Sequence, residues 1–338
     1  ADDVVDEIRN APSNQIFFTD DNLIGNKPFA KELFKKMKGM NVSWGCQMSI
    51  NVAFMPEMLA DMKAAGCFFI FIGLETLDKE AVVAMNKPVN KMDYTKAIEN
   101  IQGMGMHVIG SFIVGSDNDS PQTFVDIRDF VQKSKLSWVM VNVMNSPPGT
   151  EFLRMMEEEG RNIVYSYDEL DGAHATVKHP TMSPDEVEER FRWLYREIYS
   201  WENMLARFDH TLGQGTWTQN GITLTKKEQG LVLVRLFQEY VIKGTGAQRK
   251  FFFKVLGQLG RRVNKESVVT VLLQALNWNE FANDLKPYRR PTDQAPIVFR
   301  TEYLVPVEKQ TLGRTQEPSG VIRIGGRRAG PTPVELHA

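Results

Sequence analysis

Polar side chains gather directly after apolar segments in the first half of the chain. Apolar runs cover residues 15–19, 42–48, 67–74, 107–114 and 138–144. Carboxylate, amide and hydroxyl groups stand at or just beyond the ends of these runs: Asp20, Asp21, Asn22, Gln47, Ser49, Asn51, Glu75, Thr76, Ser116, Asp117, Asn142 and Asn145. Such groups bind the ammonium or hydroxyl groups of a ligand, and carboxylates also ligate divalent cations. The spacing therefore predicts a polar site built from several separate segments.

The apolar runs are expected to be strands of one parallel sheet. Each run is apolar on both faces, which is typical of strands that helices cover on one side. Helical segments lie between the runs and begin at Pro28, Pro56, Asp93 and Ser120, which are residue types favoured at helix starts. The alternation predicts an α/β fold of parallel β/α units. Because reactive groups gather at the carboxyl ends of the strands in such barrels, the polar residues are candidates for one shared site.

Some of these candidates have a structural explanation beside the functional one. Asp20, Asp21 and Asn22 suit a turn or a helix cap equally well, since short acidic and amide side chains bind free backbone N–H groups. Glu75 follows an apolar strand, where a buried carboxylate needs a partner such as a ligand amine or hydroxyl.

Gly110 and Gly115 flank a four-residue segment of the fourth apolar run. Glycines without a Cβ let the backbone approach a flat ligand closely. They do not open a helix, as the glycines of a dinucleotide-binding loop do. The pair therefore predicts a ligand surface on a strand.

Four short motifs, in this order and spacing, resemble those of one enzyme superfamily. They are TDDN at 19–22, GLET at 73–76, GSFIVGSD at 110–117 and PPGT at 147–150, the last followed by EEEGR at 157–161. Together they resemble radical S-adenosylmethionine (radical SAM) proteins, and more narrowly the cobalamin-binding-domain group that includes hopanoid and phosphinate methylases. The resemblance covers residues 14–207, and the helical segment that follows is similar to the C-terminal extension of the hopanoid-methylase-like branch.

The resemblance implies a partial (β/α)6 TIM-like barrel that lacks its first strand, followed by an α-helical C-terminal domain. It implies an enzyme, a methyltransferase or an oxidative cyclase, that forms a 5'-deoxyadenosyl radical to methylate or oxidatively modify a small or lipid-like substrate. The implied cofactors are S-adenosylmethionine, a 4Fe–4S cluster and cobalamin. The implied electron donor is a flavodoxin or a ferredoxin. The catalytic residues stay unassigned.

The resemblance also implies roles for individual residues. Asp21 stands where the family approaches the methionine amino group of the cofactor, and Glu75 with Thr76 matches a polar pair that lies against it. Residues 115–117 match the segment beneath the adenine and ribose, and residues 142–148 match the edge of the last strand. The implied cofactor-binding residues are Asp20, Asp21, Asn22, Gln47, Ser49, Glu75, Thr76, Gly115, Ser116, Asp117, Asn142 and Pro147.

The chain lacks the CxxxCxxC motif through which the family holds its cluster. Its two cysteines, Cys46 and Cys67, fall in predicted strands and are expected to be small buried hydrophobic residues. Residues 2–9 resemble the helix that follows this motif. We therefore expect a truncation, with the first strand and the cobalamin domain upstream, and a chain that is inactive alone.

Two alternatives remain at this stage. In a magnesium-dependent TIM-barrel enzyme, Asp20, Asp21, Glu75 and Asp117 would be the oxygen ligands. In a non-catalytic relative, the barrel and its helical extension would only bind a partner. Five scattered histidines, at positions 107, 174, 179, 210 and 337, show no metal-binding spacing, so no metal ligand is assigned.

The composition gives no global attraction to nucleic acid or to an anionic membrane, because the formal net charge is −2. Basic residues and three phenylalanines in segment 243–262 could form a membrane-surface or nucleic-acid helix, but a helix with a solvated basic face is favoured, and no nucleic-acid partner is expected. No apolar run approaches the roughly 20 residues that span a bilayer. The low cysteine content fits a reducing, cytoplasmic location.

Four segments are expected along the chain. They are a partial barrel with strands 2–6 at 1–160, a barrel-closing extension at 161–215, a helical C-terminal domain at 216–288 and a tail rich in Pro, Gly and Arg at 289–338. A long helix should begin after Ser183 and run to about residue 207, and a second should begin after Thr225. Three helices are expected between residues 225 and 285, and short β-like runs at 301–307 and 321–324.

Overall fold

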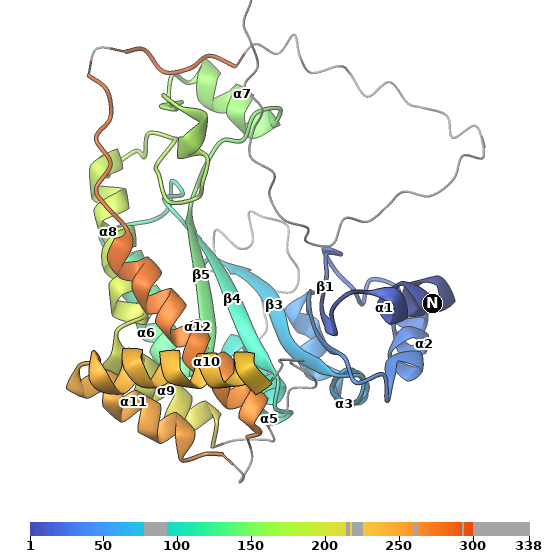
Figure 1. The fold of residues 1–338 in the computed structure, drawn as a ribbon. Helices are drawn as coiled ribbons and strands as arrows, with labels where there is room; N and C mark the ends of the chain where they lie inside the picture. The colour runs from blue at the N-terminus through green and yellow to red at the C-terminus, as the bar shows by residue number, and fades with distance from the viewer. Residues whose placement is uncertain (78–92, 214–216, 218–225, 260–262, 293, 300–338) are drawn as a thin grey trace, which may run out of the picture. The chain divides into compact units, whose positions relative to one another are not determined.

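The computed structural model describes residues 1–299 except 78–92, 214–216, 218–225, 260–262 and 293. Within this range, five strands form one parallel sheet in the order in which they occur along the chain (Figure 1). The strands are β1 (Gln15–Phe18), β2 (Ser43–Gln47), β3 (Cys67–Glu75), β4 (His107–Val114) and β5 (Trp138–Val143). Each strand begins and ends within one residue of the expected bounds, and the predicted α/β class with a parallel partial barrel is confirmed.

Helices cover the outer face of the sheet and connect the strands. Trp44 of β2 points to this face and stacks on Phe34 at a ring-centroid distance of 5.2 Å. The side chains of Asn26 and Asp93 accept hydrogen bonds from the first turns of two of the helices. The elements of this layer are α1 (Asp2–Asn10), α2 (Lys27–Met37), the 3₁₀ turn η1 (Ile50–Phe54), α3 (Pro56–Ala64), α5 (Tyr94–Gly103) and α6 (Pro121–Ser134).

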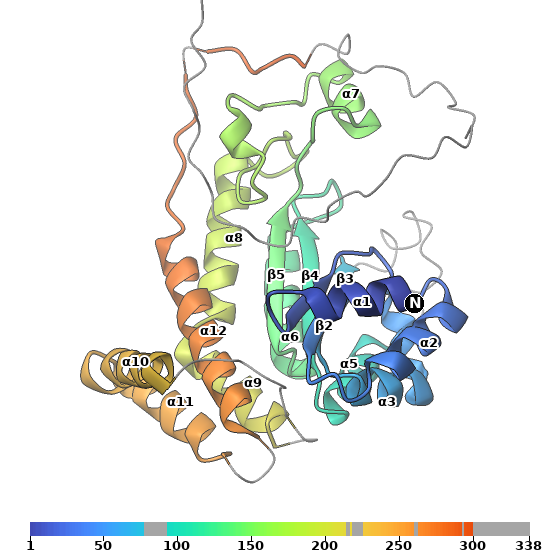
Figure 2. The same ribbon diagram turned by 45° about the vertical axis from the view of Figure 1, so that its right-hand side comes forward.

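The outer edge of β5 is closed by two tyrosines. After α7 (Glu151–Glu158) and the 3₁₀ turn η3 (Tyr167–Glu169), helix α8 (Pro184–Ile198) runs along β5 (Figure 2). The Tyr195 hydroxyl accepts a hydrogen bond from the backbone N–H of Val141 at 3.0 Å and donates one to its carbonyl at 3.0 Å. Tyr199 makes the same two bonds to Val139. The two side chains therefore occupy the backbone groups that a further strand would need.

The C-terminal part of this region is helical. Helix α12 (Lys265–Asp284) lies beside α8 in both views (Figures 1 and 2). Trp278 of α12 stacks on Tyr199 at a ring-centroid distance of 5.1 Å, and Asn279 donates a hydrogen bond to the Tyr199 carbonyl at 2.7 Å. The elements are α9 (Trp201–Thr211), α10 (Lys226–Phe237) with its π-helical end η4 (Gln238–Ile242), α11 (Gly246–Leu256) and α12 (Lys265–Asp284). The expected three helices after residue 225 are thus present.

One helix differs from the prediction. The expected helix to about residue 207 is divided, because α8 ends at Ile198 and α9 begins at Trp201. Ser200 separates them, since its hydroxyl accepts a hydrogen bond from the backbone N–H of Asn203 and so caps the new helix.

Some expectations remain untested. Thr225 and the runs 301–307 and 321–324 lie outside the described residues, and the four-segment division stays a prediction. Within the described part, every helix is too short or too polar to cross a bilayer.

Candidate functional site

The carboxyl ends of the strands lie on one edge of the sheet, because all neighbouring strands pair in parallel. This edge, called the rim below, consists of the residues at and after the ends of β1 to β5. It carries Asp21 after β1, Glu75 at the end of β3 and Asp117 after β4. The segments named from the sequence therefore share one rim, while their role in binding a cofactor stays a prediction.

The loops after β1 and β2 are joined by hydrogen bonds. The Asn22 side chain accepts one from the backbone N–H of Ser49 at 3.3 Å, and the loop after β1 donates another to the carbonyl of Gln47. Asn22 thus connects two loops, as expected of a turn residue. Asp20 and Asp21 instead hold their carboxylates at the surface, where a ligand can reach them.

Glu75 has an unusual backbone at the end of β3. Its φ is 61°, a left-handed conformation that costs a non-glycine residue about 1–2 kcal/mol. Its carboxylate turns back over Gly73, where an added Cβ would lie 2.4 Å from the Glu75 Oε1. Burial, and to a lesser degree the nearby Glu75, raise the pKa of Tyr94. Thr76, which follows, is buried. Strain held at a strand end marks Glu75 as a functional candidate.

The loop after β4 is held by residues that sequence reasoning missed. The backbone N–H of Ser116 donates to Asp119 at 2.8 Å, and its carbonyl accepts from the Nε2 of His179 at 2.8 Å. The Nδ1 of His179 accepts from the backbone N–H groups of Thr181 and Met182, which fixes the hydrogen on Nε2. Burial raises the pKa of Asp119. These hydrogen bonds hold the loop after β4 against the segment that contains His179.

Asp117 forms an ion pair with Arg161. The guanidinium donates two hydrogen bonds to the carboxylate, one of them at 2.9 Å, and a third to the carbonyl of Lys178. The hydrogen-bonded Arg161 lowers the pKa of Asp117. Arg161 belongs to the EEEGR motif, which could have marked it as a candidate in the sequence. Its pairing with Asp117 could not be read from the sequence, because 44 residues separate the two. Asp117 thus anchors the segment after α7 to the end of β4.

The expectation that Gly110 opens the strand to a flat ligand is wrong. A Cβ at Gly110 would lie 2.5 Å from the side chain of Leu136 and 3.0 Å from that of Leu74, so packing inside the protein requires the glycine. Gly115 has a φ of 88°, and a Cβ there would lie 3.3 Å from Val187. Its part in cofactor binding stays a prediction.

Asn142 and Pro147 take part in local structure at the end of β5. The Asn142 side chain fills the space beside Gly172, because a Cβ added to Gly172 would lie 2.7 Å from the Asn142 Oδ1. The backbone N–H of Val143 donates a hydrogen bond to the Gly172 carbonyl at 2.7 Å. The Pro147 carbonyl accepts from the Thr150 hydroxyl at 2.8 Å, and that hydroxyl caps α7. Both residues border the rim.

Two buried polar atoms near the rim have no hydrogen-bond partner among the described residues. They are the Oδ1 of Asn51 after β2 and the Oγ of Ser146 after β5. Such an atom costs about 1–3 kcal/mol until a partner satisfies it. A ligand with ammonium, carboxylate and hydroxyl groups, such as S-adenosylmethionine, suits this rim.

The cysteines do not suit an iron–sulfur cluster. Cys46 and Cys67 are free and buried on neighbouring strands, as predicted, and burial raises the pKa of the Cys46 thiol. Three or four cysteine thiolates hold a 4Fe–4S cluster in proteins, so two buried cysteines on neighbouring strands cannot hold one. In the described ranges, no three His, Cys, Asp or Glu side chains gather as metal ligands, so the carboxylates of the magnesium alternative do not form a ligand set.

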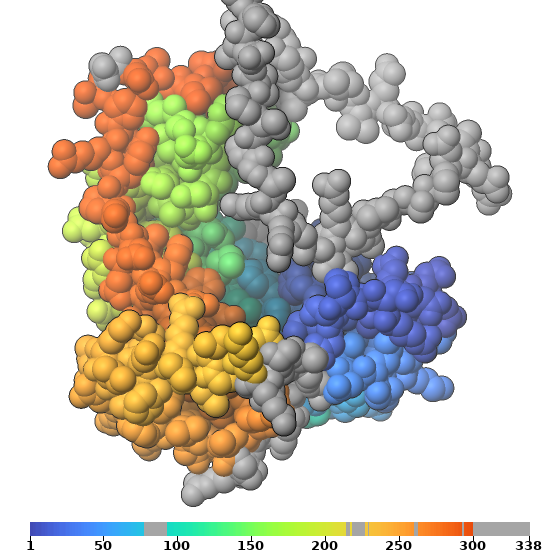
Figure 3. Space-filling model, in the orientation of Figure 1, coloured from blue at the N-terminus to red at the C-terminus, as the bar shows by residue number. Residues whose placement is uncertain are grey.

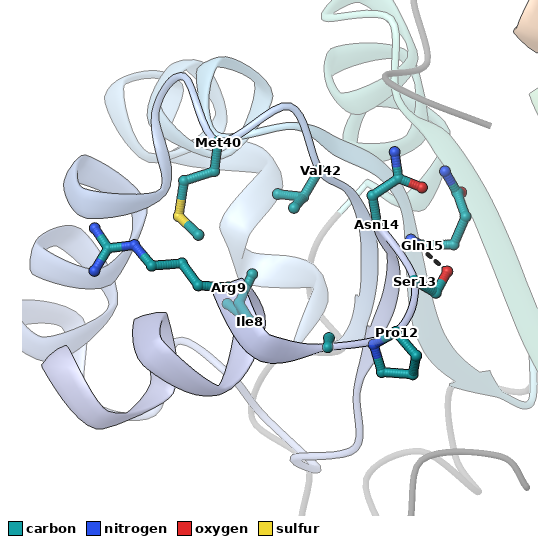
Figure 4. Close-up of a pocket in the computed structure, with 9 residues that line it drawn as sticks. Ile8, Arg9, Pro12, Ser13, Asn14, Gln15, Met40 and Val42 are labelled. Carbon is teal, nitrogen blue, oxygen red and sulfur yellow. Dashed lines mark hydrogen bonds between the residues drawn. The ribbon is translucent and has the colours of Figure 1, made fainter. Parts of the chain in front are cut away.

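A separate hollow of about 580 Å³ lies between the end of α1 and the start of β1. Figure 4 shows Arg9 and Met40 among the residues that line it, with the hydrogen bond from the Gln15 backbone to the Ser13 hydroxyl. It lies at the amino ends of the strands and contains none of the predicted cofactor-binding residues. It is therefore distinct from the rim.

Comparisons with known proteins connect this architecture to one family. The model of the radical SAM superfamily matches residues 1–131, and that of a domain of unknown function, DUF4070, matches residues 150–288. Among curated relatives, the hopanoid C-2 methylase of Rhodopseudomonas palustris is 28% identical over 60% of this chain and 39% of its own length. Bacteriochlorophyllide d C-12(1)-methyltransferase of Chlorobaculum tepidum is 26% identical, over 60% of this chain and 44% of its own length.

The chain thus spans about two fifths of the length of these relatives. Among solved structures, the radical S-adenosylmethionine methyltransferase TsrM from Kitasatospora setae, with cobalamin and a 4Fe–4S cluster bound, aligns with a TM-score of 0.43 and 11% identity, over 84% of this chain and 54% of that chain. The family matches cover strands β1 to β4 and the helices that follow β5. Residues 1–131 of this chain are thus a radical SAM segment, and a DUF4070 domain follows at residues 150–288.

Proposed function

We propose that this chain supplies the S-adenosylmethionine-binding barrel of a cobalamin-dependent radical SAM methyltransferase. The observation that carries the proposal is the radical SAM match over residues 1–131, on a parallel sheet whose rim gathers acidic, amide and hydroxyl groups. The names of the relatives, methylases of hopanoids and bacteriochlorophyllides, support methyl transfer. In this proposal the reaction is C-methylation, or an oxidative modification, of a small or lipid-like substrate.

The rim residues would bind and orient S-adenosylmethionine. The carboxylates of Asp21 and Glu75 suit its ammonium group, because charge-assisted hydrogen bonds are the stronger ones. The backbone of Ser116 is fixed by two hydrogen bonds and offers a rigid surface to the adenosyl group. A rigid binding site keeps the reacting groups in one geometry and so lowers the entropic part of the barrier.

The cluster and cobalamin would be bound by residues outside this sequence, because the two buried cysteines do not fit a cluster. A flavodoxin or a ferredoxin would be the electron donor. The buried free thiols suit a reducing compartment, so we place the protein in the cytoplasm.

The binding part of the proposal is tested by calorimetric titration of the chain with S-adenosylmethionine. Asp21→Asn and Glu75→Gln should each weaken binding by about tenfold, because each removes a hydrogen bond to a charged group. Asp209→Asn is the matched control, since Asp209 is a partly exposed acid on α9, away from the rim. The proposal fails if the chain does not bind S-adenosylmethionine, or if both rim variants bind it as the control does.

The chemical part requires the longest protein that contains this chain, reconstituted anaerobically with iron, sulfide and methylcobalamin. We expect release of 5'-deoxyadenosine when S-adenosylmethionine and a reductant are added. A filled cluster without such release would reject the radical reaction.

A further inference from the structure

A cleft of about 510 Å³ lies on the inner face of the sheet, near the amino ends of the strands, between the sheet and α12. It is called the inner cleft below. In Figure 3 the strands are visible at the bottom of a recess between α12, in orange, and the N-terminal elements, in blue. On α12, Thr270, Leu273, Gln274 and Trp278 line it from one face of the helix. The radical SAM segment and the DUF4070 segment thus form this cleft together.

The lining of the inner cleft is apolar and aromatic. Phe17 and Phe69 stack with their rings 9° from parallel, at a centroid distance of 5.8 Å. Trp138 and Trp278 add two indole rings. Gly45 leaves room for the Phe69 ring, because a Cβ there would lie 2.2 Å from that ring. No Asp, Glu, Lys or Arg is among the described residues that line the cleft, so it suits an uncharged molecule.

Two polar side chains that line the cleft are buried and lack partners. Ser43 is 2% exposed and His107 is 1% exposed. The Ser43 hydroxyl and both ring nitrogens of His107 have no hydrogen-bond partner in the described structure. Buried polar groups nearly always have a partner, and an unsatisfied one destabilises the protein. Two such residues on one cleft indicate that their partner comes from a ligand.

His107 is held as a neutral imidazole. Its ring packs against Trp217 at 4.3 Å and Phe68 at 4.9 Å. Burial, with a small contribution from the charge of Lys63, lowers the pKa of His107 to about 3. A neutral imidazole donates one hydrogen bond and accepts one. Together with the Ser43 hydroxyl it suits an alcohol or a carbonyl group rather than a carboxylate or phosphate, which needs a positive charge.

We propose that the inner cleft binds an uncharged, largely apolar molecule with a rigid or flat hydrocarbon body, and that Ser43 and His107 bind a hydroxyl or carbonyl group of that molecule. Binding itself needs neither S-adenosylmethionine nor a cluster.

The proposal is tested by displacement of N-phenyl-1-naphthylamine, an uncharged probe whose fluorescence rises in apolar sites, from the 338-residue chain. Naphthalene, 2-naphthol and 2-naphthoate share one ring system. As competitors they separate the effects of the apolar ring, of a hydrogen-bonding group and of a negative charge. We expect 2-naphthol to compete about three- to tenfold better than naphthalene, because it adds one hydrogen-bonding group. We expect 2-naphthoate to compete least, because its charge would be buried without a partner.

Variants locate the binding. Ser43→Ala and His107→Phe should each abolish the preference for 2-naphthol over naphthalene, while both variants stay folded, because each removes an unsatisfied buried polar group. Leu273→Trp should weaken all uncharged competitors by filling the cleft. Ser134→Ala is the matched control, since the Ser134 hydroxyl is also buried without a partner but does not line the cleft.

Two outcomes overturn the proposal. One is that the probe does not bind saturably to the folded chain. The other is that Ser43→Ala, His107→Phe and Leu273→Trp, shown to be folded by circular dichroism, bind the competitors as Ser134→Ala does. A chain that binds S-adenosylmethionine but no uncharged probe rejects the cleft and leaves the proposed function intact, and the reverse result rejects the function and leaves the cleft.

Discussion

The two outer strands end the sheet in different ways. At β5, Tyr195 and Tyr199 bind the backbone N–H and carbonyl groups of the free edge. At β1, the outer edge pairs with no other strand among the described residues, and Phe17 on this strand is 49% exposed. A free strand edge is a template for a further strand, whereas a covered one is not. The sheet is therefore complete at β5, and an additional strand, as the resemblance to radical SAM proteins implies, can be added only at β1.

The largest expected effect comes from opening the closed edge. Replacing Tyr195 and Tyr199 together by Phe leaves the backbone groups of Val139 and Val141 buried and unpaired, so we expect a loss of about 3–5 kcal/mol in the free energy of unfolding. Urea denaturation measures this loss. Tyr240→Phe is the control, because its buried hydroxyl makes one hydrogen bond to the carbonyl of Leu272, and it should cost about 1 kcal/mol. Equal losses in the two proteins would contradict the special role of the edge.

A second change addresses the inner face near β1. Gly45→Ala places a Cβ against the Phe69 ring, and we expect overpacking to cost about 1–3 kcal/mol. Adding Phe69→Leu should recover part of this loss, because the smaller side chain makes room for the methyl group. A thermal unfolding series of the two single variants and the double variant measures the recovery. If the stability losses of the two single variants add up in the double variant, contact with the Phe69 ring is not the cause of the Gly45→Ala loss.

The exposed aromatic ring of β1 should contribute less. Phe17→Ala removes a ring that stacks on Phe69 but is 49% exposed, so we expect a loss of about 1 kcal/mol or less in the free energy of unfolding. Phe34→Ala, at a fully buried ring of α2, should cost about 3–5 kcal/mol in the same urea experiment. Equal losses of unfolding free energy for Phe17→Ala and Phe34→Ala would show that the β1 side of the sheet is as well covered as the core.

The smallest effect is expected at the rim beside β4. Because Arg161 lowers the pKa of Asp117 in the folded protein, this carboxylate stabilises the fold at pH values above its unfolded pKa of about 3.9. The contribution is lost as the pH falls through the lower, folded pKa. Asp117→Asn should therefore reduce the free energy of unfolding by less than about 1 kcal/mol at neutral pH, since the pair is partly solvated.

This pH dependence is measured by urea denaturation of the wild type and the variant between pH 3 and pH 7. The difference between them should shrink toward the acid end of the range. A difference that grows as the pH falls would contradict the assigned sign.

The strands and most helices could be predicted because their signals are local. Parallel strands buried on both faces appear as apolar runs, and residues such as Pro56 and Asp93 mark helix starts, so the bounds came within about one residue for the strands. The division between α8 and α9 was missed, because Ser200 lies inside a continuous amphipathic pattern without Pro or Gly.

The contacts of the rim could not be predicted, because their partners are distant in the sequence. The hydroxyls of Tyr195 and Tyr199 bind backbone groups that lie 54 and 60 residues away in the sequence. The bond between His179 and Ser116 spans 63 residues. Gly110 illustrates the opposite error, since a sequence cannot show whether the space beside a glycine holds a ligand or a leucine.

The tyrosines of α8 also bear on how this chain can be divided. Strand β5 lies between the two family matches, at residues 138–143, yet the side chains that complete it belong to the DUF4070 segment. A protein fragment that ends between the two family matches would have a strand edge with unpaired backbone groups, a surface that promotes aggregation. The radical SAM segment and the DUF4070 segment therefore depend on each other for folding. A chimaera with a different DUF4070 domain would keep the β5 edge covered only if that domain supplied both tyrosines.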